Sequence, residues 1–179
     1  MQRITKEQGL RLAVKSDRVV VYAGQTADRL EPIAIRRASE ADPGEGLDFQ
    51  SFRAKRTTEG IYTQCVVGYT KAADSETIET QYEPNIPPTT GRVLYINKRI
   101  ENQAQAERMA KAELRDKNRK EQTASLSGMG DTRLRAGTVL EIQGWGRFDS
   151  KYVIAQATHT FSADGGYTTS LELEKALDY

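Results

Sequence analysis

The sequence has very few of the side chains that carry redox, metal or nucleophilic chemistry. Among 179 residues it contains one cysteine, Cys65, and one histidine, His159, which excludes an internal disulfide and a zinc site built from several cysteines. No hydrophobic run approaches the roughly 20 residues of a membrane-spanning helix. The first residues lack the apolar stretch of a secretory signal. We therefore expect a protein that is made inside the cell, has no membrane partner and holds no metal.

An excess of charge of either sign is also missing. The chain has 26 Lys and Arg against 25 Asp and Glu, a formal net charge of +1, whereas a dedicated nucleic-acid-binding domain is usually strongly basic. The sequence contains neither a Walker-type phosphate-binding loop nor a His-Glu-x-x-His motif. Two lone Gly-x-Gly motifs, at Gly128 and Gly144, do not stand between a strand and a helix as a dinucleotide site requires. We expect turns or bulges there, and no cofactor.

The main pattern that is present is an alternation of apolar and polar residues, which predicts strands. A hairpin is expected over residues 10–22, and strands are expected at Ile33–Arg36, Phe49–Lys55, Ile61–Tyr69, Thr77–Tyr82, Val93–Ile96, Leu140–Ile142, Tyr152–Phe161 and Tyr167–Glu174. Ile61–Tyr69 is apolar on both faces, which is typical of a central strand. The last strand places charge outward, with Glu172 and Glu174 on the face opposite Leu171 and Leu173.

One helix is predicted at about residues 102–118. Asn102 suits the N-cap and Gln105 the third helical position of a capping box. Its buried face is expected to be the stripe Ala106, Met109, Ala110 and Leu114, and its basic end is expected to be solvated, at Arg115, Lys117, Arg119 and Lys120. Thr5–Gly9 suits the tail of a short helix closed by glycine.

Seven or more short strands with one helix favour a mainly β fold of the α+β type, with an antiparallel barrel-like sheet. The expected domains are a small hairpin subdomain at residues 1–48 and a barrel-like domain with an inserted helix at residues 49–179. Aromatic residues gather near the predicted hairpin ends and are candidates for a subunit interface or for the end of the barrel: Trp145, Phe148, Tyr152 and Tyr167. Four glycines are assigned to turns: Gly144, Gly146, Gly165 and Gly166.

Two other functions stay open at this stage. The aromatic group around Trp145 could stack on a glycan or on single-stranded nucleic acid, as in an OB-like binding module. A hydrolase that pairs Cys65 with His159 is more distant, because Cys65 lies in the middle of a predicted strand rather than at an exposed turn. We expect His159 to share an apolar strand face with Val153, Ala155 and Ala157 and to be a hydrogen-bonded structural residue.

A series of short motifs fills the C-terminal stretch Leu134–Leu173. They are Arg135-Ala136-Gly137-Thr138, Gly144-Trp145-Gly146-Arg147-Phe148-Asp149-Ser150-Lys151-Tyr152, Ala157-Thr158-His159-Thr160-Phe161 and Gly165-Gly166-Tyr167-Thr168-Thr169. Together with the alanine-rich helix Ala104–Leu114 after Val93–Ile96, they resemble the phage late control protein D family. Members are baseplate hub proteins of contractile phage tails and are related to type VI secretion spike proteins. The resemblance spans most of the chain, most specifically residues 93–175.

The resemblance implies a non-enzymatic structural protein of a phage or prophage tail, synthesised in the bacterial host cytoplasm and then located in the virion. It implies a homo-oligomeric ring, a trimer, that joins the tail tube to the central spike and lets DNA pass through its channel as cargo. Full-length members are about twice as long, so this chain is expected to correspond to their C-terminal half. Asp149-Ser150 departs from the Asp-Gly expected at that turn.

Overall fold

The computed structural model describes residues 10–15, 18–23, 28, 30–37, 49–70 and 77–179. The chain divides into two compact units that are interleaved in the sequence. Unit 1 comprises residues 1–25, 57–121 and Tyr179, and unit 2 comprises residues 26–56 and 122–178. No helix among the described residues is long and apolar enough to span a membrane.

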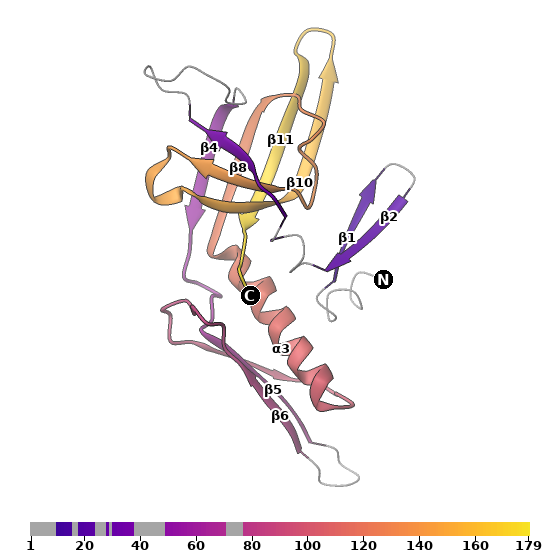
Figure 1. Cartoon of the computed structure of the whole chain (residues 1–179), viewed down its shortest axis with the longest axis vertical. Helices are drawn as coiled ribbons and strands as arrows, with labels where there is room; N and C mark the ends of the chain where they lie inside the picture. The colour runs from indigo at the N-terminus through magenta and orange to yellow at the C-terminus, as the bar shows by residue number, and fades with distance from the viewer. Residues whose placement is uncertain (1–9, 16–17, 24–27, 29, 38–48, 71–76) are drawn as a thin grey trace. The chain divides into compact units, whose positions relative to one another are not determined.

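Unit 2 is built on a six-stranded sheet with the strand order β3-β9-β10-β11-β8-β4 (Figure 1). The strands are β3 (Ile33–Arg36), β4 (Phe49–Arg56), β8 (Gln122–Met129), β9 (Val139–Gln143), β10 (Ser150–Ser162) and β11 (Gly166–Lys175). All neighbours are antiparallel except β3 and β9. The sheet is strongly curved, because Phe52 on the edge strand β4 contacts Trp145, which follows β9 near the other edge, with ring centroids 5.0 Å apart. The mainly β fold of the α+β type is therefore confirmed, with parallel pairs that the sequence did not indicate.

The core of unit 2 lies on one face of this sheet. Leu171 and Leu173 of β11 are buried there, and the intervening Glu172 is exposed, as the alternation predicts. In β10 a β-bulge at residue 155 shifts the alternation, since Ile154 pairs with Leu173 but Gln156 pairs with Glu172. The expected face of His159 is therefore wrong in part: His159 lies on the core face with Ala157, whereas Val153 and Ala155 do not share that face.

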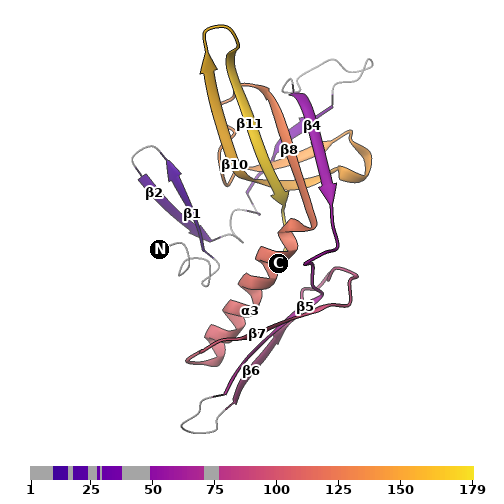
Figure 2. The ribbon, with the colours of Figure 1, turned by 180° about the vertical axis from the view of Figure 1, so that it is seen from behind.

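Unit 1 contains a three-stranded sheet with the order β6-β5-β7 and one α-helix, α3 (Figure 2). The elements are β5 (Gln64–Thr70), β6 (Thr77–Tyr82), β7 (Val93–Asn97), α3 (Gln103–Asn118) and the short 3-10 helix η1 (Arg119–Glu121). β5 is the central strand, as its apolar sequence predicted. One face of the sheet packs against α3 and forms a core of Cys65, Val67, Ile78, Ile100, Ala106, Met109, Ala110 and Leu114.

The predicted bounds and N-cap of α3 are confirmed, but the expected solvation of its basic end is wrong in part. The side chain of Asn102 accepts a hydrogen bond from the backbone N–H of Gln105 at 2.9 Å. At the other end Arg115 and Arg119 are buried instead of solvated, and only Lys117 and Lys120 are exposed. The guanidinium of Arg115 lies over the ring of Tyr179, 5.7 Å from its centroid, so an aromatic partner shields this charge from water.

The N-terminal hairpin is present: β1 (Leu10–Lys15) pairs with β2 (Arg18–Ala23) in an antiparallel two-stranded sheet. The helix tail expected at Thr5–Gly9 lies outside the described residues. The subdomain expected at residues 1–48 stays a prediction. β3 pairs with β9 and thereby joins the six-stranded sheet of unit 2.

Candidate functional site

Cys65 has no access to solvent and no tendency to ionise. Its side chain is fully buried in the core of unit 1. Burial and, to a smaller extent, the negative charge of Glu113 together raise the pKa of the thiol to about 12. The thiol is therefore protonated at neutral pH, and a protonated thiol is a poor nucleophile. Cys65 therefore does not suit the role of nucleophile in the hydrolase hypothesis.

Both ring nitrogens of His159 have hydrogen-bonding partners within unit 2. Nε2 lies 3.0 Å from the backbone carbonyl of Leu134, and Nδ1 lies 2.9 Å from the hydroxyl of Tyr167 and 3.0 Å from that of Thr169. In the neutral ring Nε2–H donates to Leu134, and Nδ1 accepts from a hydroxyl. The imidazole also stacks on Tyr167, with centroids 5.8 Å apart. This arrangement is that of a satisfied structural histidine, and it joins the loop after β8 to the β10–β11 hairpin.

Gly130 makes room for this cluster. A Cβ atom at position 130 would lie 2.0 Å from Cδ1 of Tyr167, so only glycine allows the tyrosine ring its present position.

In the same loop Arg133 donates to the carboxylate of Asp131 at 2.7 Å. The side-chain hydrogen bond from Arg133 lowers the pKa of Asp131 below its ordinary value. No group of three or more His, Cys, Asp or Glu in the described part of the chain is arranged to hold a metal ion.

Three of the four predicted aromatic residues come together around the short 3-10 helix η2 (Gly146–Phe148). Tyr152 is fully buried, bonds with the side chain of Gln122, and donates to the backbone carbonyl of Phe148 at 2.9 Å. Trp145 is half-buried against Phe52. The fourth residue, Tyr167, lies elsewhere on the same hairpin, because it pairs with Phe161 near the turn, whereas Tyr152 pairs with Lys175 at the opposite end of β11.

The turn around η2 is closed by the side chain of Asp149. Its carboxylate accepts hydrogen bonds from the backbone N–H groups of Gly144 at 3.1 Å and Trp145 at 2.6 Å. Gly144 and Gly146 have φ values of 94° and 67°, in the left-handed region that favours glycine. Gly166, with φ of 66°, has the same role in the β10–β11 turn. Gly165 has no such φ; a Cβ there would lie 2.8 Å from Oγ of Ser162, which already accepts from its N–H.

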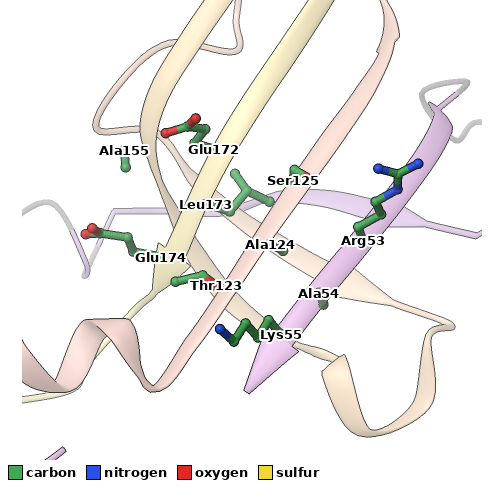
Figure 3. Close-up of a pocket in the computed structure, with 10 residues that line it drawn as sticks. All are labelled: Arg53, Ala54, Lys55, Thr123, Ala124, Ser125, Ala155, Glu172, Leu173 and Glu174. Atoms are coloured by element: carbon green, nitrogen blue, oxygen red, sulfur yellow. The ribbon is translucent and has the colours of Figure 1, made fainter. Parts of the chain in front are cut away.

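A shallow cavity of about 430 Å³ lies over β4, β8 and β11, on the face opposite the core (Figure 3). Two rows of side chains cross the strands there. Register places Arg53, Ser125 and Glu172 in one row, and Lys55, Thr123 and Glu174 in the next. The cationic groups stand on β4, the carboxylates on β11, and short hydroxyl side chains lie between them (Figure 3).

This polar face carries two cationic and two anionic side chains with neutral hydroxyl groups between them. Opposite charges that are separated by an intervening strand and exposed to water attract each other weakly. The outward position of Glu172 and Glu174 was predicted, but the cationic half of the face was missed. Its signal was present in the sequence as the alternation of Arg53 and Lys55 with Phe52 and Ala54, which face the core.

The fold is shared with tail proteins of phages and prophages. The tail protein from Neisseria meningitidis MC58 matches with a TM-score of 0.67 and 16% identity, over 97% of this chain and 53% of that one. The 43 kDa tail protein of prophage MuSo2 from Shewanella oneidensis matches with a TM-score of 0.68 and 13% identity, over the same shares. A chain of the virion of a native gene transfer agent particle matches with a TM-score of 0.52 and 12% identity, over 98% of this chain and 38% of that one.

The chain thus spans about half the length of the two tail proteins, and at these identities the likeness shows the fold alone. No curated protein matches the chain. A family model described as YQBQ-like matches residues 45–174, which is well over half of the sequence. The chain therefore belongs to the YQBQ-like family.

Proposed function

We propose that this chain is a structural component of a phage or prophage tail. The observation that supports the proposal is the shared fold, which extends over 97% of the chain in two tail proteins from different bacteria. The chemistry of the site agrees with a structural role. The thiol of Cys65 is buried and protonated, and both nitrogens of His159 are used in holding a loop.

The proposed role in the tail is that of a baseplate hub of the late control protein D type. Such a hub is a ring-forming homo-oligomer, a trimer, and it joins the tail tube to the central spike. The gene transfer agent chain, which is part of a virion, supports a location in the assembled particle. This chain matches about half the length of the two tail proteins, so the proposal for this chain concerns that part of a hub.

The surface of unit 2 suggests how a ring would use this chain. The balanced polar face of β4, β8 and β11 would suit the wall of a channel, since it carries as many cationic as anionic groups and would not retain passing DNA. Trp145 and Phe148, which are half-buried at one end of the sheet, would contribute to the contact between subunits, and the buried Tyr152 would support that end from inside.

The mass of the protein in solution tests this proposal. We expect light scattering after size-exclusion chromatography to give three times the mass of one chain, and electron microscopy to show rings with a central hole. A stable contact should bury more than roughly 1,000 Å². Phe148→Ser should lower the fraction of trimer, whereas Thr89→Ala, at an exposed position of unit 1, should not. A monomer at every concentration tested, together with absence of the protein from purified tails, would refute the hub.

A further inference from the structure

Gly68 lies in the middle of β5, the central strand of unit 1, and no bulge, positive φ or close contact within the described structure requires glycine at this position. It pairs with Glu79 on β6 and with Asn97 on β7, and neither register shows an irregularity there. Its φ lies outside the left-handed region, and a Cβ atom at this position would meet no atom within 4 Å. Glycine weakens the interior of a strand, and where no bulge or bend requires it, it often marks a place where something else approaches the backbone closely.

The open space above Gly68 is part of a shallow hollow. α3 packs against the face of the sheet that carries Cys65 and Val67, so alternation places Gly68 and Val66 on the opposite face. The hollow has a volume of about 350 Å³, and its lining includes Val66, Gly68, Thr77, Glu79, Tyr95 and Asn97. The floor is thus a glycine between a carboxylate and an amide, with an aromatic ring one row away.

The aromatic ring of this hollow is unusually accessible. Tyr95 is 75% exposed, although large aromatic side chains in a strand are normally half-buried or better. It pairs with Val66, so its row adjoins that of Gly68. The exposed ring of Tyr95 offers a flat apolar surface, and the missing side chain of Gly68 leaves a slot beside it. A flat ligand can contact the ring and enter the slot at the same time.

We propose that this hollow is a binding site for a saccharide ring. The apolar C–H face of a sugar would pack against the aromatic ring of Tyr95. Sugar hydroxyls need both donors and acceptors. The Asn97 amide offers both, and the Glu79 carboxylate accepts. The volume is at the small end of the roughly 300–1,000 Å³ of ligand sites, which suits one or two rings.

Two other ligand classes fit the hollow less well. A nucleic acid could stack a base on Tyr95, but the carboxylate of Glu79 would repel its phosphates. An added β-strand would pair with a free edge, at β6 or β7, whereas the hollow lies on the face over the central strand β5. The site is independent of the ring proposed above, because all of its lining residues belong to unit 1.

Amide chemical shifts of the whole chain, titrated with two defined oligosaccharides, test the site. The probes are the tetramer of β-1,4-linked N-acetylglucosamine and the tetramer of α-1,4-linked glucose. We expect at least one to shift the amide signals of Gly68 and Asn97 saturably at millimolar concentration. Tyr95→Ala should weaken binding about tenfold or more. Thr89→Ala, an exposed hydroxyl outside the hollow, should leave the affinity unchanged.

Gly68→Val is the decisive variant, because it fills the slot and leaves every polar group in place. Valine favours strands, and its Cβ atom would have no atom within 4 Å here, so thermal unfolding should occur at the same or a higher temperature. Binding should nevertheless fall about tenfold or more. The proposal is overturned if neither sugar binds the native chain, or if Gly68→Val binds as well as the native chain. It is also overturned if Gly68→Val changes the oligomeric mass while sugar affinity stays constant, which would identify a second copy as the occupant.

Discussion

Replacement of Asn118 by alanine removes three hydrogen bonds at once from a fully buried position at the end of α3. The side-chain oxygen of Asn118 accepts from the backbone N–H of Tyr62 at 2.9 Å. Its amide nitrogen donates to the carbonyl of Tyr62 at 2.8 Å and to the hydroxyl of Tyr179 at 2.9 Å. The side chain thus pairs with the backbone of the segment before β5 as a neighbouring strand would, and it connects that segment to the helix.

The expected cost follows from the number of bonds. Each hydrogen bond contributes about 1 kcal/mol net, and a buried group that is left without a partner costs more. Asn118→Ala should therefore lower the free energy of unfolding by roughly 3 kcal/mol. For a unit of this size that corresponds to a drop of roughly 10–25 °C in the midpoint of thermal unfolding.

Hydrogen exchange gives a local readout that a general loss of stability does not. The amide hydrogen of Tyr62 should be protected in the native chain and should exchange much faster in Asn118→Ala, beyond the change seen for the core of unit 2. Lys117→Ala, an exposed position next to it on the helix, is the matched control and should change stability by less than about 0.5 kcal/mol. If Asn118→Ala proves as mild as the control, the bonds assigned to Asn118 do not hold the segment.

Three further predictions concern separate sites. The thiol of Cys65, with a pKa of about 12, should be ionised in roughly one molecule in ten thousand at pH 8, so a thiol reagent should label it far more slowly in the native than in the unfolded chain. Gly130→Ala should destabilise by about 1–3 kcal/mol in denaturant titrations, because the added Cβ would lie 2.0 Å from the ring of Tyr167. For Asp131, whose pKa is lowered by Arg133, stabilisation should be complete well above the unfolded value of 3.8 and should be lost as the pH falls below it. Unfolding curves of the native chain and Asp131→Asn should thus differ near neutral pH and converge in acid.

Each of these has an outcome that contradicts it. Rapid labelling of native Cys65 would show that the core of unit 1 opens readily. Gly68→Ala is the control for Gly130→Ala, since no atom lies within 4 Å of its added Cβ; equal losses in both would show that the effect is not steric. A constant difference between native chain and Asp131→Asn down to the lowest pH would mean that the carboxylate does not stabilise the loop through its charge.

Patterns within a single segment of sequence were enough to predict α3, the outward face of β11 and the central position of β5. The capping residues and the alanine-rich stripe of α3 identified both its start and its buried face, because a helix repeats its contacts every three or four residues. The alternation in β11 identified its outward carboxylates for the same kind of reason. The central position of β5 followed from its apolar residues on both faces.

Features that depend on tertiary partners could not be predicted in this way. The bulge at residue 155 has no mark in its own segment, and it moves Val153 and Ala155 off the face of His159. The burial of Arg115 depends on Tyr179, which is distant in the sequence. Trp145 and Tyr167 both lie near turns in the sequence, but Trp145 lies between β9 and β10, whereas Tyr167 lies beside the turn between β10 and β11.

The strands at the two edges of the large sheet are made long before the strands they pair with. Arg36 of β3 meets Gln143 of β9, 107 residues later, and β4 precedes the stretch 57–121 while its partner β8 follows it. During synthesis β3 and β4 remain unpaired until β9 and β8 have been made. The stretch 57–121 contains its own helix and sheet and all the buried residues of its core, which Tyr179 joins later. Such distant pairings slow folding and leave strand edges open to wrong partners in the meantime. The order of strands in the sequence therefore predicts the order of folding: the helix and sheet of the stretch 57–121 form first, and the six-stranded sheet of unit 2 is completed last.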